Sequence, residues 1–177
     1  MIARRSLLAL IALLPIPVPA FAATQPARKS PMSDRSPTRM DQFQAVIDAW
    51  KRKDVEAVFD AMTDDVVWHY AAAIAPPARG KAEARAFVDQ FGANIGEVRW
   101  RIFHHCESGD RLFVEGVDEY TTKDGIDIAA PYAGVIEFRG DKISGWRDYV
   151  DRGTIESQKA GNGWSDQVKE LAGRPAQ

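Results

Sequence analysis

The spacing of apolar residues changes midway along the chain, and this change constrains the fold more than any other feature of the sequence. Between residues 39 and 91 the apolar residues recur every three or four positions, which predicts amphipathic helices. From residue 97 onward they alternate with polar residues, which predicts strands with one buried face. Helices followed by long strands indicate an α+β domain.

Three helices are expected in the first part of the domain. Thr38 and Asp41 form a capping pair before a helix of roughly twelve residues, and Asp54 begins a second helix. A short strand is expected over 66–70, and a third helix runs over 81–91 until Gly92 ends it. The apolar stripes of the first two helices are Phe43, Val46, Ile47 and Trp50, and Val55, Val58, Phe59 and Met62.

Four strands are expected in the second part, over 97–107, 111–121, 128–139 and 142–151. Glycine-containing turns at 108–110, 123–125 and 140–141 separate them, and a last short helical turn lies near Val168 and Leu171. We expect a strongly curved, mixed and mostly antiparallel sheet wrapped over the three N-terminal helices. Such a cone encloses a central apolar pocket, where ligand sites usually lie.

Residues 1–22 have the pattern of an export signal. Arg4 and Arg5 precede an apolar run over 7–14, and Ala20-Phe21-Ala22 offers a cleavage site. The arginine pair also loosely resembles a twin-arginine signal. The pattern predicts a periplasmic or secreted protein, whereas a true start at Met32 would make it cytoplasmic. After the signal we expect a disordered tether over 23–38, the domain over 39–155, and a tail with a short helix over 156–177.

The charge and cysteine content exclude several classes of function. Removing residues 1–22 removes two arginines and no acids, so 21 basic and 25 acidic residues leave a formal charge of −4. No basic stripe exists, so we expect no nucleic-acid partner, and no membrane association after signal removal. Cys106 is the only cysteine, which excludes an intrachain disulfide.

Two aspartates are the candidate catalytic residues. Asp148 lies among Trp146, Tyr149 and Val150 on a strand expected to be buried, and alternation places Asp118 on the face of its own strand that carries Gly116. A buried carboxylate is costly, so it is usually kept for chemistry or for a partner. If both enter one pocket, their pKa values separate and one acts as acid, the other as base. The alternative is that each pairs with an arginine or caps backbone groups.

The histidines and the cysteine are weaker candidates. His104 and His105 are adjacent on a strand and point to opposite faces, so no metal site is expected. Cys106 lacks the partners of a thiol nucleophile. His69 either lines the pocket mouth as an auxiliary acid or base, or is simply packed and hydrogen-bonded.

The segment from Gly134 to Asp151, with its Gly145-Trp146-Arg147-Asp148-Tyr149 string, resembles the limonene-1,2-epoxide hydrolase family. That family is grouped with SnoaL-like cyclases and ketosteroid isomerases in the NTF2-like cone fold, and the likeness extends over about residues 40–155. The resemblance implies that Asp148 is the base on water and Asp118 the acid on the epoxide. It also implies a homodimer formed through the open face of the sheet.

Three positions depart from the hydrolase pattern. Gly116 stands where an arginine bridges the two acids, and Trp68 and Tyr70 stand where a tyrosine and an asparagine hold the attacking water. Arg101 or Arg147 would have to supply the missing charge, although alternation places Arg147 on the other face. Glu115 and Glu119 are expected on a solvated or interface face.

Three functional hypotheses follow from the sequence. The leading one is an epoxide-hydrolase-like enzyme for a small hydrophobic substrate, with Trp68, His69, Tyr70, Gly116 and Trp146 around the substrate or water, and without metal or organic cofactor. The first rival is an isomerase or cyclase, which Gly116 favours. The second is a non-catalytic protein that binds a small apolar ligand.

Overall fold

The computed structural model describes residues 36–72 and 74–176, which fall within one compact unit spanning 36–177. The predicted signal peptide and most of the predicted tether lie outside the described residues. In the described ranges, none of the helices combines the length and the apolar character that crossing a membrane requires.

The three predicted N-terminal helices are present, but the second ends at Asp60, so Met62 of its predicted apolar stripe lies outside it. They are α1 (Arg39–Lys51), α2 (Val55–Asp60) and α3 (Gly80–Gly92). Thr38 and Asp41 form the predicted capping box, and the Asp54 side chain accepts a hydrogen bond from the backbone of α2. These caps satisfy backbone N–H groups that a helix start leaves free.

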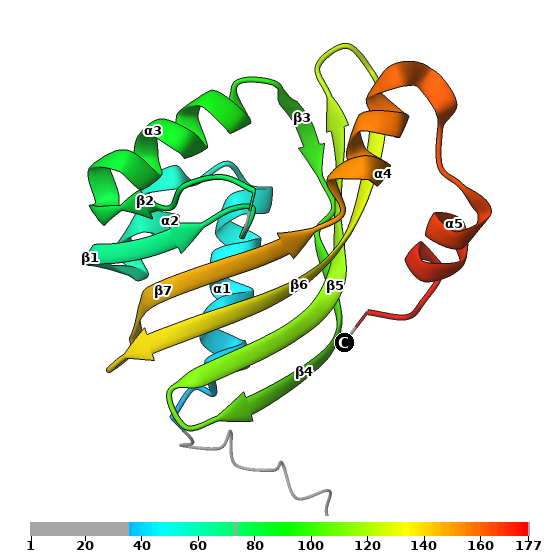
Figure 1. Cartoon of the computed structure of the whole chain (residues 1–177). Helices are drawn as coiled ribbons and strands as arrows, with labels where there is room; N and C mark the ends of the chain where they lie inside the picture. The colour runs from blue at the N-terminus through cyan, green and yellow to red at the C-terminus, as the bar shows by residue number, and fades with distance from the viewer. Residues whose placement is uncertain (1–35, 73, 177) are drawn as a thin grey trace, which may run out of the picture. The chain divides into compact units, whose positions relative to one another are not determined.

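Seven strands form one strongly curved sheet in the order β2-β1-β7-β6-β5-β3, with β4 also paired to β5 (Figure 1). Only the β1–β7 pair is parallel. The predicted fold class, a mixed and mostly antiparallel sheet wrapped over helices, is therefore confirmed. The strands are β1 (Met62–His69), β2 (Ala78–Arg79), β3 (Ile95–Val98), β4 (Arg101–Ser108), β5 (Arg111–Thr122), β6 (Asp127–Arg139) and β7 (Lys142–Val150).

The prediction of one strand over 97–107 was wrong. The chain breaks the strand at Arg99 and Trp100, and two shorter strands, β3 and β4, pair in turn with β5. At the break the Arg99 amide still donates to the Glu119 carbonyl, at 2.6 Å. The register against β5 shifts before and after the break, between Ile95 and Val98 and between Ile102 and His104, and such irregularities bend a sheet. Between these two shifts lies Trp100, which lines the cavity described below.

The apolar residues form two clusters, one on each face of the sheet. The larger one fills the concave face beneath α1–α3 and contains most of the buried residues. The smaller one lies on the convex face, where Val168 of α5 (Asp166–Ala172) packs with Phe103, Val117 and Ala129. Figure 1 shows α5 beside the strongly curved strands. The segment 156–177, expected as a tail, thus contributes to the core of the described unit.

An additional helix, α4 (Arg152–Ser157), was not predicted. It follows β7 directly and continues into a π-helical turn over Gln158–Asn162. The predicted domain end at residue 155 falls within it. The side-chain amide of Gln158 is buried and exchanges two hydrogen bonds, 2.9 and 3.0 Å, with the backbone of Ala129. Ala129 lies on β6 before Tyr132, where the pairing of β6 with β7 begins. The side-chain amide of Gln158 therefore pairs with backbone groups that a neighbouring strand would otherwise satisfy.

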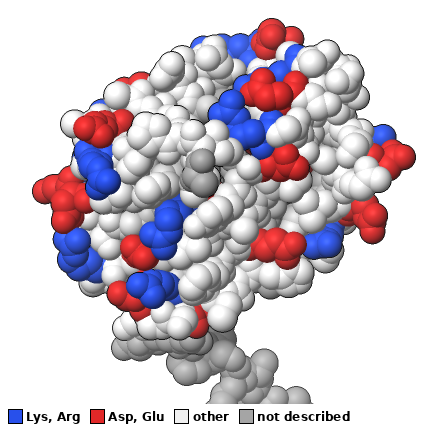
Figure 2. Space-filling model, in the orientation of Figure 1, with Lys and Arg blue, Asp and Glu red and all other residues white. Residues whose placement is uncertain are grey.

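On the face shown in Figure 2, acidic and basic side chains are interspersed.

Candidate functional site

A cavity of about 220 Å³ lies between the concave face of the sheet and the helices. Aromatic side chains dominate its wall, and only Asp118 and Asp148 bring carboxyl groups into it from the sheet. The other polar side chains come from the segment after β7. The lining residues that matter below are Trp68, Tyr70, Trp100, Asp118, Tyr120, Tyr132, Trp146, Asp148, Arg152, Glu156 and Lys159.

Asp148 reaches the cavity because alternation along β7 puts it on the same face as Trp146 and Val150, as predicted. Its carboxylate accepts two indole hydrogen bonds, from Nε1 of Trp146 at 2.6 Å and from Nε1 of Trp68 at 3.3 Å. The parallel register of β1 and β7 pairs Trp68 with Trp146, and their rings stack at 4.8 Å.

The pKa of Asp148 is raised to about 7, chiefly because burial disfavours the charged form. The two indole hydrogen bonds act in the opposite direction, since they stabilise the carboxylate, and the charge of Asp118 raises the pKa further. The site therefore keeps a carboxyl group that changes its protonation near neutral pH.

Asp118 enters the cavity from β5, and burial raises its pKa to about 7 as well. The adjacent carboxylate of Glu119 contributes in the same direction. Within the described ranges, no side chain or backbone group donates a hydrogen bond to Asp118. A carboxyl group in an apolar wall without donors is more stable protonated. Asp118 is thus suited to donate a proton, and Asp148, held by two donors, to accept one.

The structure places Trp68, Tyr70 and Trp146 in the cavity wall, where the sequence led us to expect them. It does not place His69 there. His69 pairs with Arg147 in the β1–β7 register and alternates with the cavity-facing Trp68, so its assignment to the pocket mouth was wrong.

Gly116 is also absent from the cavity lining. A Cβ atom at this position would overlap the backbone carbonyl of Arg101 and lie 3.1 Å from Cε1 of Tyr132. The place expected for substrate or water beside Gly116 is therefore filled by the irregular start of β4 and by a tyrosine ring. This also explains physically why a large bridging side chain does not occur at position 116.

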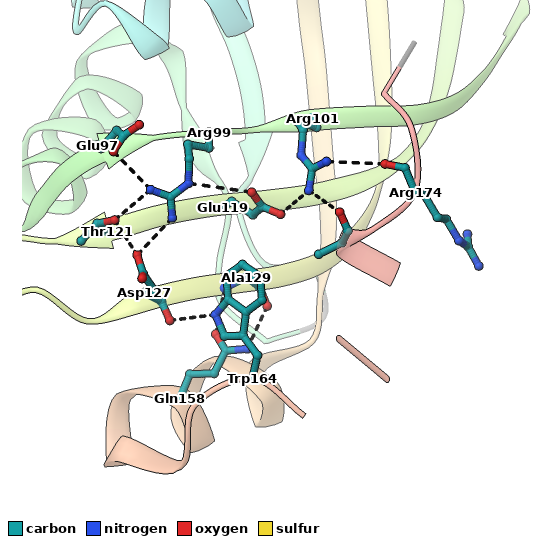
Figure 3. A network of polar contacts seen from close by, with 11 residues as sticks. Glu97, Arg99, Arg101, Glu119, Thr121, Asp127, Ala129, Gln158, Trp164 and Arg174 are labelled. Atoms are coloured by element: carbon teal, nitrogen blue, oxygen red, sulfur yellow. Dashed lines mark hydrogen bonds and ion pairs between the residues drawn. The ribbon is translucent and has the colours of Figure 1, made fainter. Parts of the chain in front are cut away.

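Neither arginine considered as a replacement enters the cavity. Arg101 pairs with Glu119 on the convex face and also donates to the Ala172 carbonyl, at 2.6 Å (Figure 3). Arg147 pairs with Glu137 at 3.0 Å. Of the solvated or interface face expected for Glu119, the solvated one was wrong, because Glu119 pairs with Arg99 and Arg101 and is only 5% exposed.

The remaining candidates lie at the surface. His104 pairs with Glu115 at 2.9 Å, and Cys106 is exposed. Among residues 36–72 and 74–176, no three His, Cys, Asp or Glu side chains gather in a way that would hold a metal ion.

Sequence reasoning missed two parts of the cavity wall. Tyr132 lies on the inner face of β6, where a tyrosine looks like any other core aromatic. Arg152, Glu156 and Lys159 come from α4 and the turn after it, and Arg152 pairs with Glu156 at 3.2 Å. A signal for this helix was present, because Asp151 and Thr154 have capping spacing and the Asp151 carboxylate accepts from the Thr154 amide.

Comparison with known proteins identifies the family. The model of the SnoaL-like domain family matches residues 43–146, which is more than half of the chain. The chain belongs to the SnoaL-like family. No curated protein sequence matches it.

Solved structures similar to this SnoaL-like protein share its fold at low sequence identity. A protein with a ketosteroid isomerase-like fold from Catenulispora acidiphila, in complex with trimethylamine, is 22% identical with a TM-score of 0.62, over 70% of this chain and 95% of that one. A candidate SnoaL-like polyketide cyclase from Shewanella putrefaciens is 15% identical with a TM-score of 0.65, over 72% and 99%. An LEH-like epoxide hydrolase from M. tuberculosis is 20% identical with a TM-score of 0.58, over 66% and 85%.

Proposed function

We propose that this SnoaL-like protein is an enzyme that transfers protons on a small, mainly apolar carbonyl compound, as an isomerase or a cyclase does. The observation that carries the proposal is the contrast between the two acids that face the cavity. Asp148 accepts hydrogen bonds from Trp68 and Trp146, whereas Asp118 accepts none from the described residues. Donors to the charged form make Asp148 the base, and Asp118, kept neutral by its apolar surroundings, is the acid.

In the isomerase reaction, Asp148 takes a proton from a carbon next to the carbonyl group. The electron pair of the broken C–H bond forms a C=C bond, and the carbonyl oxygen takes the negative charge. Where the substrate carries a C=C bond one carbon further on, the proton of Asp118 goes to the far carbon of that bond, the C=C bond shifts to the position next to the carbonyl group, and the C=O bond is restored. In a cyclase the carbanion instead attacks a second carbonyl carbon, whose oxygen takes the proton of Asp118. Proton exchange with water returns both aspartates to their starting forms.

Epoxide hydrolysis is the second candidate, supported by the same pair of acids and by the fold shared with an LEH-like epoxide hydrolase. Epoxide hydrolysis is the leading hypothesis from the sequence alone, but the geometry of the site favours it less than proton transfer. Hydrolysis needs a water molecule held at the base and, in the related hydrolases, a cation between the acids. Here indoles contact both oxygens of Asp148, and Gly116 has no room for a side chain.

The test uses the full-length protein in D2O with a panel of cyclic ketones and enones, followed by mass spectrometry, and a parallel panel of cyclic epoxides. Deuterium in the ketone without net hydration supports proton transfer, and diols from the epoxides support hydrolysis instead. Asp148→Asn should abolish the reaction, whereas Asp64→Asn, a change at a side chain that is 98% exposed, should not affect it. Ligand binding with neither reaction would overturn both candidates in favour of a binding protein.

A further inference from the structure

Two polar groups in the cavity wall are not used by the acid–base pair. They are the hydroxyl group of Tyr132 and the indole N–H of Trp100, in side chains that are 5% and 8% exposed. Neither meets the distance and angle of a hydrogen bond with any described residue, although the Trp100 N–H lies close enough to the Tyr132 hydroxyl to lower the pKa of that group. A buried donor left unpaired destabilises the folded chain, so such groups usually have a partner that binds from outside the chain, a water molecule or a ligand.

The contrast with the neighbouring indoles is informative. Trp68, Trp146 and Trp100 form a stack, with ring centroids 4.8 Å and 5.8 Å apart and interplanar angles of 20° and 18°. The first two donate to Asp148. The third does not, and its ring lies 5.7 Å from that of Tyr132 instead. Trp100 and Tyr132 are thus a second pair of polar groups on the same aromatic wall.

The register of the sheet places this pair between the two acids. On β6, Ala130 lies opposite Asp118, and Gly134 lies opposite Asp148. Tyr132 is the residue between them on the same face of the strand. Its ring lies over Gly116 and Gly134, where added Cβ atoms would come within 3.1 Å and 3.3 Å of its Cε atoms. The two glycines therefore make room for the ring of a tyrosine whose place on β6 is between the positions opposite the acid and the base.

We propose that the Tyr132 hydroxyl and the Trp100 indole N–H form a subsite for the carbonyl oxygen of an otherwise apolar ligand. Burial and the nearby aspartates outweigh the Trp100 N–H and hold the pKa of Tyr132 well above its ordinary value, so the hydroxyl stays protonated and can donate. A carbonyl oxygen accepts two hydrogen bonds, which matches two donors. This inference rests on the proposed function: the oxygen that gains charge when Asp148 removes a proton would lie at these donors.

The subsite also restricts the substrate class. The cavity wall is mostly aromatic and offers two neutral donors, so a planar cyclic or aryl ketone fits its chemistry better than an epoxide. An epoxide oxygen would have to lie at Asp118, the proton donor of that reaction.

The test compares two probes that differ only in the oxygen: 2-acetylnaphthalene and its methylene isostere, 2-isopropenylnaphthalene. Binding to the full-length protein is followed by tryptophan fluorescence, and the carbonyl stretch of the bound ketone by infrared difference spectroscopy. The wild type should prefer the ketone by about tenfold, which is the effect of one well-made buried hydrogen bond. The carbonyl stretch should move to lower frequency on binding.

Tyr132→Phe keeps the ring and removes the hydroxyl. It should remove most of the ketone preference, weaken the infrared shift and leave the affinity for the hydrocarbon unchanged. Tyr149→Phe is the matched control, because Tyr149 is 51% exposed on the other face of β7. Trp100→Phe should also reduce the ketone preference. If loss of the Trp100 stack unfolds the protein, the result for Tyr132→Phe alone tests the subsite.

Equal wild-type affinity for the two probes, failure of either to bind, or a preference that survives Tyr132→Phe would each overturn the subsite. A ketone preference that depends on Tyr132, without any deuterium exchange in the earlier assay, would support the subsite and count against the proposed reaction. The two proposals can thus fail separately.

Discussion

Trp146 donates a hydrogen bond to a carboxylate on its own strand: its Nε1 lies 2.6 Å from Oδ1 of Asp148, two residues further along β7. Residues two apart on a strand share a face, so one short segment supplies both the carboxylate and its hydrogen-bond donor. The parallel neighbour β1 adds Trp68 from the opposite register position. The protonation of Asp148 is therefore set by the strand pairing that also builds the cavity wall.

Replacing the donors should raise the pKa of Asp148 above its present value of about 7, since each indole hydrogen bond stabilises the charged form. Trp146→Phe should act more strongly than Trp68→Phe, because its hydrogen bond is 2.6 Å rather than 3.3 Å long. A carboxyl titration by 13C NMR measures the change. Trp164→Phe is the control, as this indole donates to the Asp127 carbonyl on the outer side of the sheet. An unchanged midpoint in Trp146→Phe would contradict the assignment.

Stability should fall as the pH rises from about 4 to above 7. In this range Asp118 is ionised in the unfolded chain but still protonated in the fold, where its pKa is raised to about 7. The folded state then binds more protons, so the free energy of unfolding decreases with pH, by an amount on the order of 2–4 kcal/mol for a shift of this size. The raised pKa of Asp148 also makes the free energy of unfolding decrease as the pH rises.

Urea unfolding at pH 5 and pH 8 measures this effect. Asp118→Asn cannot ionise, so its stability should change less between the two pH values than that of the wild type. Asp64→Asn, at an exposed position, should follow the wild-type curve. The same pH dependence in Asp118→Asn and wild type would show that this carboxyl group is not buried in the way described.

Much of the fold could be predicted because local signals coincide with tertiary structure. Alternating residues between glycine-containing turns located β5, β6 and β7 to within one residue at most ends. The break at Arg99 and Trp100 was missed because alternation continues across it, and β3 and β4 both pair with the same strand, β5.

The two acids were found because carboxylates among aromatics are rare on buried strands. The role of Tyr132 could not be found in this way. On sequence, a tyrosine on the inner face of a strand is a core residue, and its unpaired hydroxyl emerges only from the packing of Trp100 and of two glycines around it. His69 shows the opposite error, because alternation already placed it on the face away from Trp68.

Gly116→Ala should lower stability by about 1–3 kcal/mol, the usual cost of adding a group to a filled site. The new Cβ would overlap the Arg101 carbonyl, which is backbone and cannot rotate away, and would press on the ring of Tyr132. Thermal unfolding checks the stability, and the probe preference described above checks the position of Tyr132. Gly153→Ala serves as control, because its added Cβ meets only an Asp151 side-chain oxygen, at 3.3 Å. A Gly116→Ala protein as stable as the control would mean that β4 can shift freely here.

The homodimer expected from the family resemblance would have to use only part of the convex sheet face. Helix α5 already covers Phe103, Val117 and Ala129, whereas Phe113 on β5 and Tyr149 on β7 are 41% and 51% exposed. These two lie on strands that flank β6, and they pair with its residues Val135 and Ala133. An apolar area left open on an otherwise covered face favours association there.

We therefore expect Phe113→Glu to shift the protein from dimer to monomer in size-exclusion chromatography with light scattering, because the dimer would bury the new carboxylate without a partner. Ile74→Glu makes the same kind of change at a side chain that is 56% exposed outside this face, and it should leave the dimer intact. Deleting residues 163–177 should increase association further, since it uncovers the apolar cluster beneath α5. A monomeric wild type would contradict the homodimer, and a dimer that tolerates Phe113→Glu would place its interface elsewhere.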